Sequence, residues 1–359
     1  MLIFSQKKYQ FPNALMNLKP FIIPLFIPHM GCPHRCVFCD QSTITGHKNG
    51  GLSPQQVRDT ITQHLGFKGR RRGSVEAAFY GGNFLGLPTS ARESLLDEAQ
   101  RFVEKGQVES IRFSTRPDTV THGALEALAP YTVRAIEVGA QSMDDTVLGL
   151  SRRGHTAAQT GDAVKGLKAH GLQVGLQIMP GLPGDTPTSI LETGQRVAEL
   201  RPDFVRIYPT VVVKNTLLAK WYASGRFKPL SLAEAVELTK KLYVLLTGCG
   251  IQIIRMGLQP SGSLLEGGHV VAGPFHPAFG HLVHSAIFLD RATRAFERQP
   301  GLSKRVTLKV YPKDLSKLMG LKKHNIKHLI KRFDLEELRV VPDLAVAQHT
   351  VRVDNLPNL

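Results

Sequence analysis

The chain has 359 residues and an apolar content of 42%, which is ordinary for a soluble globular protein. No stretch reaches the ~20 apolar residues of a membrane span, and residues 1–20 lack a signal-peptide pattern, so we expect a cytoplasmic protein. Lysine and arginine outnumber aspartate and glutamate by 45 to 29, a formal net charge of +16. That excess favours a polyanionic partner, RNA or DNA first, although solubility alone would also account for it.

After an N-terminal extension at 1–19, apolar and β-branched runs alternate with helical patterns. We predict six strands, at 21–28, 75–80, 110–114, 135–138, 173–178 and 204–208. Helices are predicted between them, at 54–65, 89–104, 122–129, 143–150, 156–170 and 186–200. Strands separated by helices form parallel βαβ units, which wind into a barrel or a doubly wound sheet. Six units are fewer than the eight of a closed barrel.

Less regular segments follow the sixth predicted strand. A helix at 232–246 precedes a possible further strand at 251–255, and the Gly- and Pro-rich residues 257–275 are typical of a loop. A last long helix is predicted at 276–298. These patterns divide the chain into an α/β domain at 20–258, a linker and helical extension at 259–302, and a small module at 303–359.

Polar and glycine-rich segments gather where the predicted strands end. In parallel α/β folds, functional residues lie at the carboxyl ends of the strands. Here those ends carry Cys32 to Cys39, Gly81-Gly82-Asn83, Ser114 to Asp118, Gln141-Ser142, Met179 to Gly184, and Pro209-Thr210. We therefore expect all of these segments to line one rim.

Three of the four cysteines, Cys32, Cys36 and Cys39, lie within eight residues of one another. Disulfide scaffolds spread their cysteines along the chain, so a tight cluster indicates a metal site. Three thiolates at this spacing would hold a 4Fe–4S cluster and leave one iron open for catalysis. Zinc is an alternative, with His29 or His34 as a fourth ligand, and a purely structural cysteine cluster is another.

The C-x3-C-x2-C spacing, the aromatic Phe38 before the last cysteine, and the position after a first strand resemble the radical S-adenosylmethionine (radical SAM) superfamily. The resemblance implies a partial (β/α)6 radical SAM barrel with two cofactors, a 4Fe–4S cluster and S-adenosylmethionine. In that superfamily one electron from the cluster cleaves S-adenosylmethionine to a 5′-deoxyadenosyl radical, which abstracts hydrogen from a substrate. The protein binds and orients these groups and excludes water.

The same resemblance implies which residues meet the cofactors. The three cysteines would ligate iron and be the catalytic residues. A GGE-like motif that meets the amino group of the cofactor corresponds to Gly81-Gly82-Asn83, with Asn83 at the acidic position. The implied cofactor-binding residues are Phe38, Gly81, Gly82, Asn83, Ser114, Gln141, Arg153 and Gly181. On physical grounds alone these segments also fit tight turns, a capped helix start and a solvated helix end.

Residues from about 20 to 258 look like the catalytic core of the Elongator catalytic subunit and its bacterial relatives. The strings GAQSMDD, SRRGHT, GLPGDT, RIYPT and SGRFKPLS carry this resemblance. That subunit also has an acetyltransferase domain. Residues after 258 show no acetyl-CoA loop motif, so we do not expect acetyl transfer by this chain.

The last module is strongly basic. Residues 303–339 hold 11 Lys and Arg against 4 Asp and Glu, a local net charge of +7. The predicted order is a strand at 305–310, helices at 314–319 and 323–332, and strands at 338–341 and 346–353. The loop between the helices resembles the GxxG loop of a KH module, which clamps single-stranded nucleic acid. Nucleic-acid contacts are expected at Gly320, Lys322, Lys323 and Lys327, although Lys323 stands where the second glycine belongs. A basic α/β cap on the barrel is the alternative.

These features together predict a radical SAM enzyme that modifies RNA, tRNA first, with a ferredoxin or flavodoxin as electron donor. Two alternatives are a radical SAM enzyme acting on a small molecule or tetrapyrrole precursor, and a non-catalytic iron–sulfur nucleic-acid-binding protein. Cys249 is expected to be a buried small hydrophobe. Trp221 and Tyr222 are expected in the core, with a substrate-stacking role as the alternative.

Overall fold

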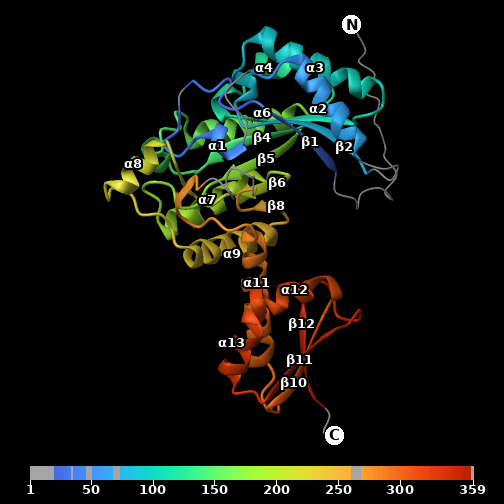
Figure 1. The fold of residues 1–359 in the computed structure, drawn as a ribbon, viewed down its shortest axis with the longest axis vertical. Helices are drawn as coiled ribbons and strands as arrows, with labels where there is room; N and C mark the ends of the chain where they lie inside the picture. The colour runs from blue at the N-terminus through green and yellow to red at the C-terminus, as the bar shows by residue number, and fades with distance from the viewer. Residues whose placement is uncertain (1–19, 34, 46–50, 68–72, 260–267, 357–359) are drawn as a thin grey trace.

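The structure is a computed structural model and describes residues 20–33, 35–45, 51–67, 73–259 and 268–356. The predicted N-terminal extension at 1–19 lies outside the described residues, as does His34. The described chain forms a large α/β domain and a smaller C-terminal module, joined by the long helix α11 (Phe279–Glu297) (Figure 1).

Seven parallel strands form the sheet of the large domain, in the order β1-β2-β3-β4-β5-β6-β8. Their bounds are β1 (Phe21–Phe26), β2 (Val75–Tyr80), β3 (Ser110–Thr115), β4 (Val133–Gln141), β5 (Gln173–Ile178), β6 (Phe204–Ile207) and β8 (Gln252–Met256). Each strand follows its neighbour in sequence, so the sheet curls in one direction into a half-barrel. The predicted partial barrel is confirmed. The possible further strand predicted at 251–255 is β8, which pairs in parallel with β6 and adds a seventh strand to the six predicted βα units.

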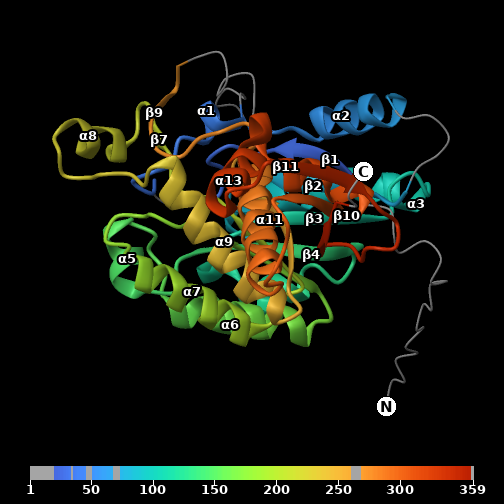
Figure 2. The same ribbon diagram turned by 90° about the horizontal axis from the view of Figure 1, so that it is seen from below.

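Helices cover the outer face of this sheet, as the views in Figures 1 and 2 show. They are α2 (Pro54–Gly66), α3 (Thr89–Glu104), α4 (His122–Glu126), α5 (Asp145–Leu150), α6 (Ala157–Ala169), α7 (Pro187–Leu200) and α9 (Leu232–Gly248). The short helix α1 (Gln41–Thr45) follows the cysteine loop after β1. Side-chain caps fix where several of them begin: Ser53, Thr156 and Ser231 each form a capping box.

Alternation along the strands separates an apolar outer face from a polar inner face. On β2, Val75, Ala77 and Phe79 belong to the apolar core that the outer helices cover. Glu76 and Tyr80 point to the opposite face. The concave face of the half-barrel is therefore the polar one.

Buried charges pair across this concave face. Arg112 on β3 lies 2.9 Å from Glu76, and Arg206 on β6 donates to Glu137 on β4 at 3.0 Å. The Tyr80 hydroxyl donates to Glu137 at 3.1 Å. Burial, followed by the nearby Glu137 carboxylate, raises the pKa of Tyr80, so the phenol stays protonated. These pairs fill the floor of the half-barrel below the strand ends.

A small insertion follows β6 at the rim of the half-barrel. It comprises β7 (Val212–Val213), which pairs antiparallel with β9 (Val270–Ala272), and helix α8 (Leu217–Ala223). Figure 2 shows α8 projecting beside β7 and β9 at one edge of the domain. The residues 257–275 were predicted as a loop, and β9 is a departure from that prediction.

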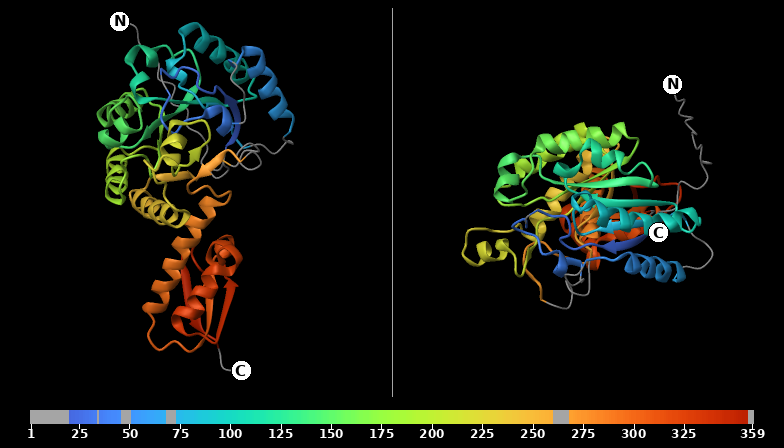
Figure 3. Two further views of the ribbon diagram at one scale, coloured as in Figure 1. Left: turned by 60° about the vertical axis from the view of Figure 1, so that its left-hand side comes forward. Right: turned by 90° about the horizontal axis from the view of Figure 1, so that it is seen from above.

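The C-terminal module packs on the second half of α11 (Figure 3). Its sheet has the order β11-β10-β12, with β10 (Arg305–Val310) parallel to β11 (Glu337–Pro342) and antiparallel to β12 (Val351–Asn355). Helices α12 (Leu315–Met319) and α13 (His324–Phe333) connect β10 to β11. Short 3-10 turns lie at Phe84–Gly86, Pro117–Thr119, Pro312–Asp314 and Leu321–Lys323.

Three smaller predictions need correction. Tyr222 is exposed and Trp221 is only half-buried, so this pair does not lie in the core. Cys249 is exposed rather than buried, because it caps the end of α9, beyond Leu246, the last buried residue of that helix. The last strand begins at Val351 rather than 346, since the Asp343 side chain accepts from Ala345 N and holds the preceding residues in a turn. Among the described residues, no helix is long and apolar enough to cross a membrane.

Candidate active site

The cysteine loop follows β1 and is fixed at several points along its length. Val37 N donates to Ser151 O at 3.2 Å, and Leu218 N, at the start of α8, donates to Val37 O at 2.8 Å. Val37 and Phe38 are buried in an apolar cluster that also contains Val147, Leu182 and Leu218. The loop is therefore held between α5, the turn after β5 and α8, on the rim where the strands end.

The three thiols lie close enough to influence one another. Burial, followed by the neighbouring Cys36 thiol, raises the pKa of Cys32 and also that of Cys39. Arg116 and Arg153 act in the opposite direction on Cys32. Arg153 also donates from Nη1 to Cys36 Sγ at 3.2 Å. Because the pKa values of Cys32 and Cys39 are raised, a bound cation is needed to hold these two thiols as thiolates beside Cys36.

The donor set fits an iron–sulfur cluster by its chemistry. Thiolates are the ligands of such clusters, and an arginine that donates to one of the sulfurs stabilises their negative charge. Among the residues described, no group of three His, Cys, Asp or Glu side chains already converges on a metal position. Each cysteine of a 4Fe–4S cluster binds a different iron, so the three thiols do not have to meet at a single metal position.

The end of β2 is bound to the cysteine loop through Asn83, which is fully buried. Its Nδ2 donates to Gly31 O at 2.8 Å, while its Oδ1 accepts from Thr115 Oγ1 at 2.7 Å and from Arg116 N at 3.0 Å. A side chain at Gly82 would meet Ile27 O at 2.4 Å, so only glycine fits there. The Asn83 side chain is thus used within the protein, and Gly81 and Gly82 offer backbone to the rim.

The end of β3 places two different groups on the rim. Ser114 is half-buried on the concave face. Arg116 is buried beside the cysteine loop and donates from Nε to Asp118 at 2.9 Å. The Asp118 carboxylate accepts from Arg116 and holds it in place, and the cap of the following helix α4 is Thr121.

The end of β4 brings Gln141 and Arg153 together. Gln141 has a φ of 67°, in the left-handed region that a non-glycine residue rarely adopts. Its side chain accepts from Gln177 Nε2 at 3.2 Å. Arg153 donates from Nη2 to Gly139 O at 2.6 Å and, as above, from Nη1 to Cys36. Arg153 therefore connects the β4 end to the cysteine loop, whereas its neighbour Arg152 is exposed.

The turn after β5 is closed by Asp185. Its Oδ2 accepts from Gly181 N at 3.0 Å and Leu182 N at 3.2 Å, and its Oδ1 accepts from Ser189 Oγ at 3.0 Å. Burial raises the pKa of Asp185 to about 6 in spite of these three bonds. Gly181 lies in this turn, on the same rim as the other predicted cofactor residues.

The loop between α12 and α13 packs on the first half of α11, at Ser285, and belongs to the C-terminal module rather than to the half-barrel. Lys322 and Lys323 both have left-handed backbone, with φ of 50° and 59°. Lys322, Lys323 and Lys327 are exposed. Gly320 packs against Ser285 of α11, and the adjacent Asn325 donates to Ser285 O at 2.9 Å, which anchors this loop to the helix.

Sequence reasoning missed Arg116 as a neighbour of the cysteines and missed the ion pairs on the concave face. A signal for the latter was present, since Glu76, Arg112, Glu137 and Arg206 are charges inside otherwise apolar strands. A charge in the middle of a central strand needs a partner on the same face of the sheet.

The fold and the rim together define a class: a parallel half-barrel with a three-cysteine loop after its first strand. A model of the Radical SAM superfamily matches residues 26–197, and a model of the Radical_SAM C-terminal domain matches residues 202–288. The chain belongs to the radical SAM superfamily. It is an enzyme of that class, whose cofactors are a 4Fe–4S cluster and S-adenosylmethionine.

Similar proteins come from bacteria, archaea and eukaryotes. The chain is 28% identical over 230 residues to a tRNA uridine(34) acetyltransferase of Dehalococcoides mccartyi, covering 55% of this chain and 50% of that protein. It is 28% identical over 262 residues to Elongator complex protein 3 of Saccharomyces cerevisiae, covering 61% and 47%. The chain thus spans about half the length of these two curated relatives.

One solved structure supports the fold directly. The archaeal Elp3 of Methanocaldococcus infernus, with an N-terminal deletion, superposes with a TM-score of 0.60 at 22% identity. The match covers 74% of this chain and 62% of that one.

Proposed function

We propose that this protein uses its radical chemistry to modify RNA, with tRNA as the first candidate. The similarity to proteins named as tRNA uridine(34) acetyltransferases supports the substrate class. The strong positive charge of the chain supports it independently, since a phosphate backbone is the commonest large polyanion in a cell. When bound, the cluster supplies the electron that cleaves S-adenosylmethionine to the 5′-deoxyadenosyl radical.

We assign the iron ligands to Cys32, Cys36 and Cys39. Their shared loop, the raised pKa values of Cys32 and Cys39 beside Cys36, and the donation from Arg153 to Cys36 support this assignment. The fourth position of the cluster is left for S-adenosylmethionine. Burial of Val37 and Phe38 keeps water away from one side of the loop.

The remaining rim residues are proposed to bind and orient S-adenosylmethionine. Gly81, Gly82 and the backbone of Asn83 present carbonyls that suit an amino group. Arg153 suits a carboxylate through its planar guanidinium. Phe38, Ser114, Gln141 and Gly181 complete the proposed set. The Asn83 side chain acts here as a positioning group, because its polar atoms are bonded to the loops on either side.

The C-terminal module is proposed to hold the RNA. Exposed Lys322, Lys323 and Lys327 lie on or beside the loop before α13, at the position that a GxxG loop has in a KH module. A left-handed backbone at Lys323 is the conformation that the second glycine of such a loop would favour. We further propose a cytoplasmic location and a ferredoxin or flavodoxin as the electron donor.

An anaerobic assay with S-adenosylmethionine, a reductant and bulk tRNA tests the proposal. We expect 5′-deoxyadenosine to form and the tRNA to change in mass, with neither change in a Cys36→Ala variant. Failure of the protein to bind tRNA at low salt would overturn the RNA substrate. Formation of no 5′-deoxyadenosine by cluster-loaded protein would instead indicate a non-catalytic iron–sulfur protein.

A further inference from the structure

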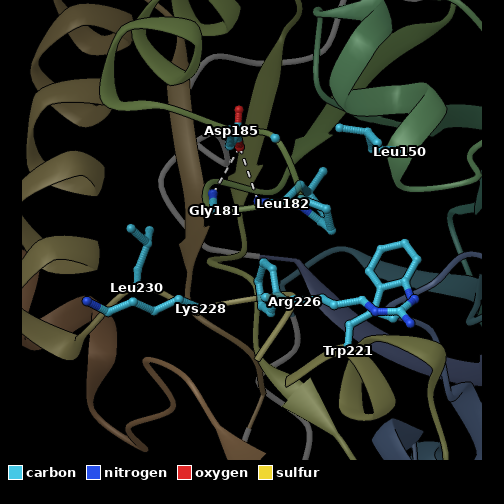
Figure 4. Close-up of a pocket in the computed structure, with 11 residues that line it drawn as sticks. Leu150, Gly181, Leu182, Asp185, Trp221, Arg226, Lys228 and Leu230 are labelled. Atoms are coloured by element: carbon cyan, nitrogen blue, oxygen red, sulfur yellow. Dashed lines mark hydrogen bonds between the residues drawn. The ribbon is translucent and has the colours of Figure 1, made fainter. Parts of the chain in front are cut away.

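We propose that a cavity between α8 and the turn after β5 binds one nucleotide of a single-stranded RNA segment. This inference rests on the proposed function and names a part of the substrate that lies outside the cysteine loop. The cavity has a volume of about 460 Å³, and its walls include Leu150, Leu182, Trp221, Arg226, Lys228 and Leu230 (Figure 4). That volume is in the range of small-ligand sites in proteins.

The cavity is distinct from the proposed cofactor site but attached to it. Of the eight residues proposed to bind S-adenosylmethionine, only Gly181 lines it. Leu182 and Trp221 also pack in the apolar cluster that contains Cys36 and Val37. The Leu218 N to Val37 O bond ties α8 to the same loop. A ligand in the cavity would therefore be held at a fixed place relative to the cysteines.

The end of α8 places an aromatic side chain and a cation next to each other. Gly225, with a φ of 74°, ends the helix, and Arg226 N donates to Trp221 O at 2.8 Å while Gly225 N donates to Tyr222 O at 3.1 Å. This is a Schellman motif, which fixes the chain just past the helix. Figure 4 shows the Arg226 side chain extending toward the indole of Trp221.

The charges in the cavity favour an anionic ligand. Arg226 and Lys228 are exposed. Hydrogen bonds from Ser231, followed by the charge of Lys228, lower the pKa of Glu234, so part of the Lys228 charge is offset by that carboxylate, whereas Arg226 has no such acidic neighbour among the residues that line the cavity. The one acid in the wall, Asp185, accepts hydrogen bonds from Gly181 N and Leu182 N and from Ser189. Its oxygens are thus directed at its own turn rather than at a ligand.

A nucleotide within an RNA strand fits these features together. Its base would stack on Trp221 against the apolar wall, as bases stack on aromatic side chains in single-strand-binding proteins. An internal nucleotide carries a phosphate on each side. Figure 4 shows the Arg226 and Lys228 side chains extending in opposite directions along the wall, so that one cation serves each phosphate.

The single tryptophan of the chain gives this proposal a direct readout. Trp221 fluorescence is followed while cluster-loaded protein is titrated with a short single-stranded oligouridine, and binding is measured in parallel by anisotropy of a labelled copy. We expect fluorescence quenching that saturates at the same RNA concentration as the anisotropy. S-adenosylmethionine alone should leave the fluorescence unchanged.

Single substitutions separate the contribution of base stacking on Trp221 from that of the positive charge of Arg226. Trp221→Leu should weaken RNA binding about 5- to 100-fold, whereas Trp221→Phe should restore most of it. Arg226→Ala should weaken binding and make the logarithmic salt dependence shallower by about 0.7. Lys105→Ala, which removes an exposed lysine at the end of α3, is the matched control and should bind as the wild type. Thermal unfolding of each variant confirms that it is folded.

The possible failures are distinguishable. If the wild type binds RNA but Trp221 stays silent and Arg226→Ala binds equally well, the nucleotide site is wrong and the proposed function survives. Quenching by S-adenosylmethionine alone would assign the cavity to the cofactor's adenosine instead. If the wild type binds bulk tRNA but not the oligouridine, only the nucleotide site is wrong; if it binds neither, both proposals fall together.

Discussion

At the scale of single residues, Asn83 connects the parts of the rim that have to stay in register. The side-chain amide of Asn83 donates a hydrogen bond to Gly31 O, in the loop before the cysteines. It accepts one from Arg116 N, at the start of the turn after β3. Thr119 Oγ1 also donates to Asn83 Oδ1, at 2.9 Å. A neutral amide can do this in a buried place, because it both donates and accepts without a charge to desolvate.

Replacement of Asn83 by alanine should therefore destabilise the domain. Gly31 O and Arg116 N would lose their partner in a place without water, which costs about 2–3 kcal/mol in unfolding free energy. Urea denaturation followed by circular dichroism measures the change. Gln107→Ala, at an exposed position, is the control and should change stability little; equal stability of the two variants would contradict the role of Asn83.

The cysteines give a second prediction at this scale. Alanine at position 32, 36 or 39 should remove most of the bound iron and the visible absorption of the cluster after anaerobic reconstitution. Cys249→Ala should retain both, because Cys249 is exposed at the end of α9. Iron analysis and absorption spectroscopy decide the matter, and a Cys36→Ala protein with a full iron content would refute the ligand assignment.

At the scale of elements, α11 is the helix that both parts of the molecule share. Its first half packs Phe279, Val283 and Ile287 with Ala235 of α9. Its second half contributes Phe288, Ala292 and Phe296 to the core of the C-terminal module. One continuous helix in two cores makes a stiffer connection than a loop would.

His284 makes this junction sensitive to acid. Its ring packs edge to face on Tyr243 of α9, with ring centroids 5.2 Å apart. Burial, followed by the positive charge of Lys317, lowers the pKa of His284 to about 4, while Asp314 acts in the opposite direction. The unfolded chain binds a proton at this residue below about pH 6.5 and the folded chain does not until about pH 4.

The free energy of unfolding should therefore fall as the pH is lowered from about 6.5 to 4. His284→Phe keeps a ring against Tyr243 and removes the titration, so its stability should fall less over that interval. Denaturant titrations at a series of pH values measure both curves. His328→Phe, at an exposed position of α13, is the control with wild-type behaviour; identical curves for all three proteins would be evidence against this account.

At the scale of the whole molecule, the large domain packs on the first half of α11, and the core of the basic module is built on its second half (Figure 1). Deleting the C-terminal module is a poor test of its role in RNA binding, because the deletion would expose Phe288 and Phe296 of α11 to solvent. Changing its exposed charges leaves these cores in place. The lysines of the α12–α13 loop are suited to that test, since Lys322, Lys323 and Lys327 are exposed.

Alanine at all three of these positions should weaken RNA binding and make the logarithmic salt dependence shallower by about 2, which corresponds to three phosphate contacts on a single strand. Filter binding at several salt concentrations measures the slope. The triple variant Lys105→Ala, Lys165→Ala, Lys241→Ala removes the same charge from exposed sites on the large domain. If both triple variants lose affinity equally, the module has no special role and only net charge matters.

The parallel half-barrel and the position of the cysteine loop could both be predicted from the sequence. Strand and helix periods, caps such as Ser53, and the spacing of Cys32, Cys36 and Cys39 are local signals, and parallel topology then brings the strand ends to one rim. Only the tertiary structure decided which side chains meet there. Arg153 reaches Cys36 across 117 positions of sequence, and Asn83 bonds partners more than 30 positions away on both sides. Such contacts depend on how the sheet curls and on which neighbouring group forms a hydrogen bond with each buried polar atom. Neither is written in the pattern of a single strand.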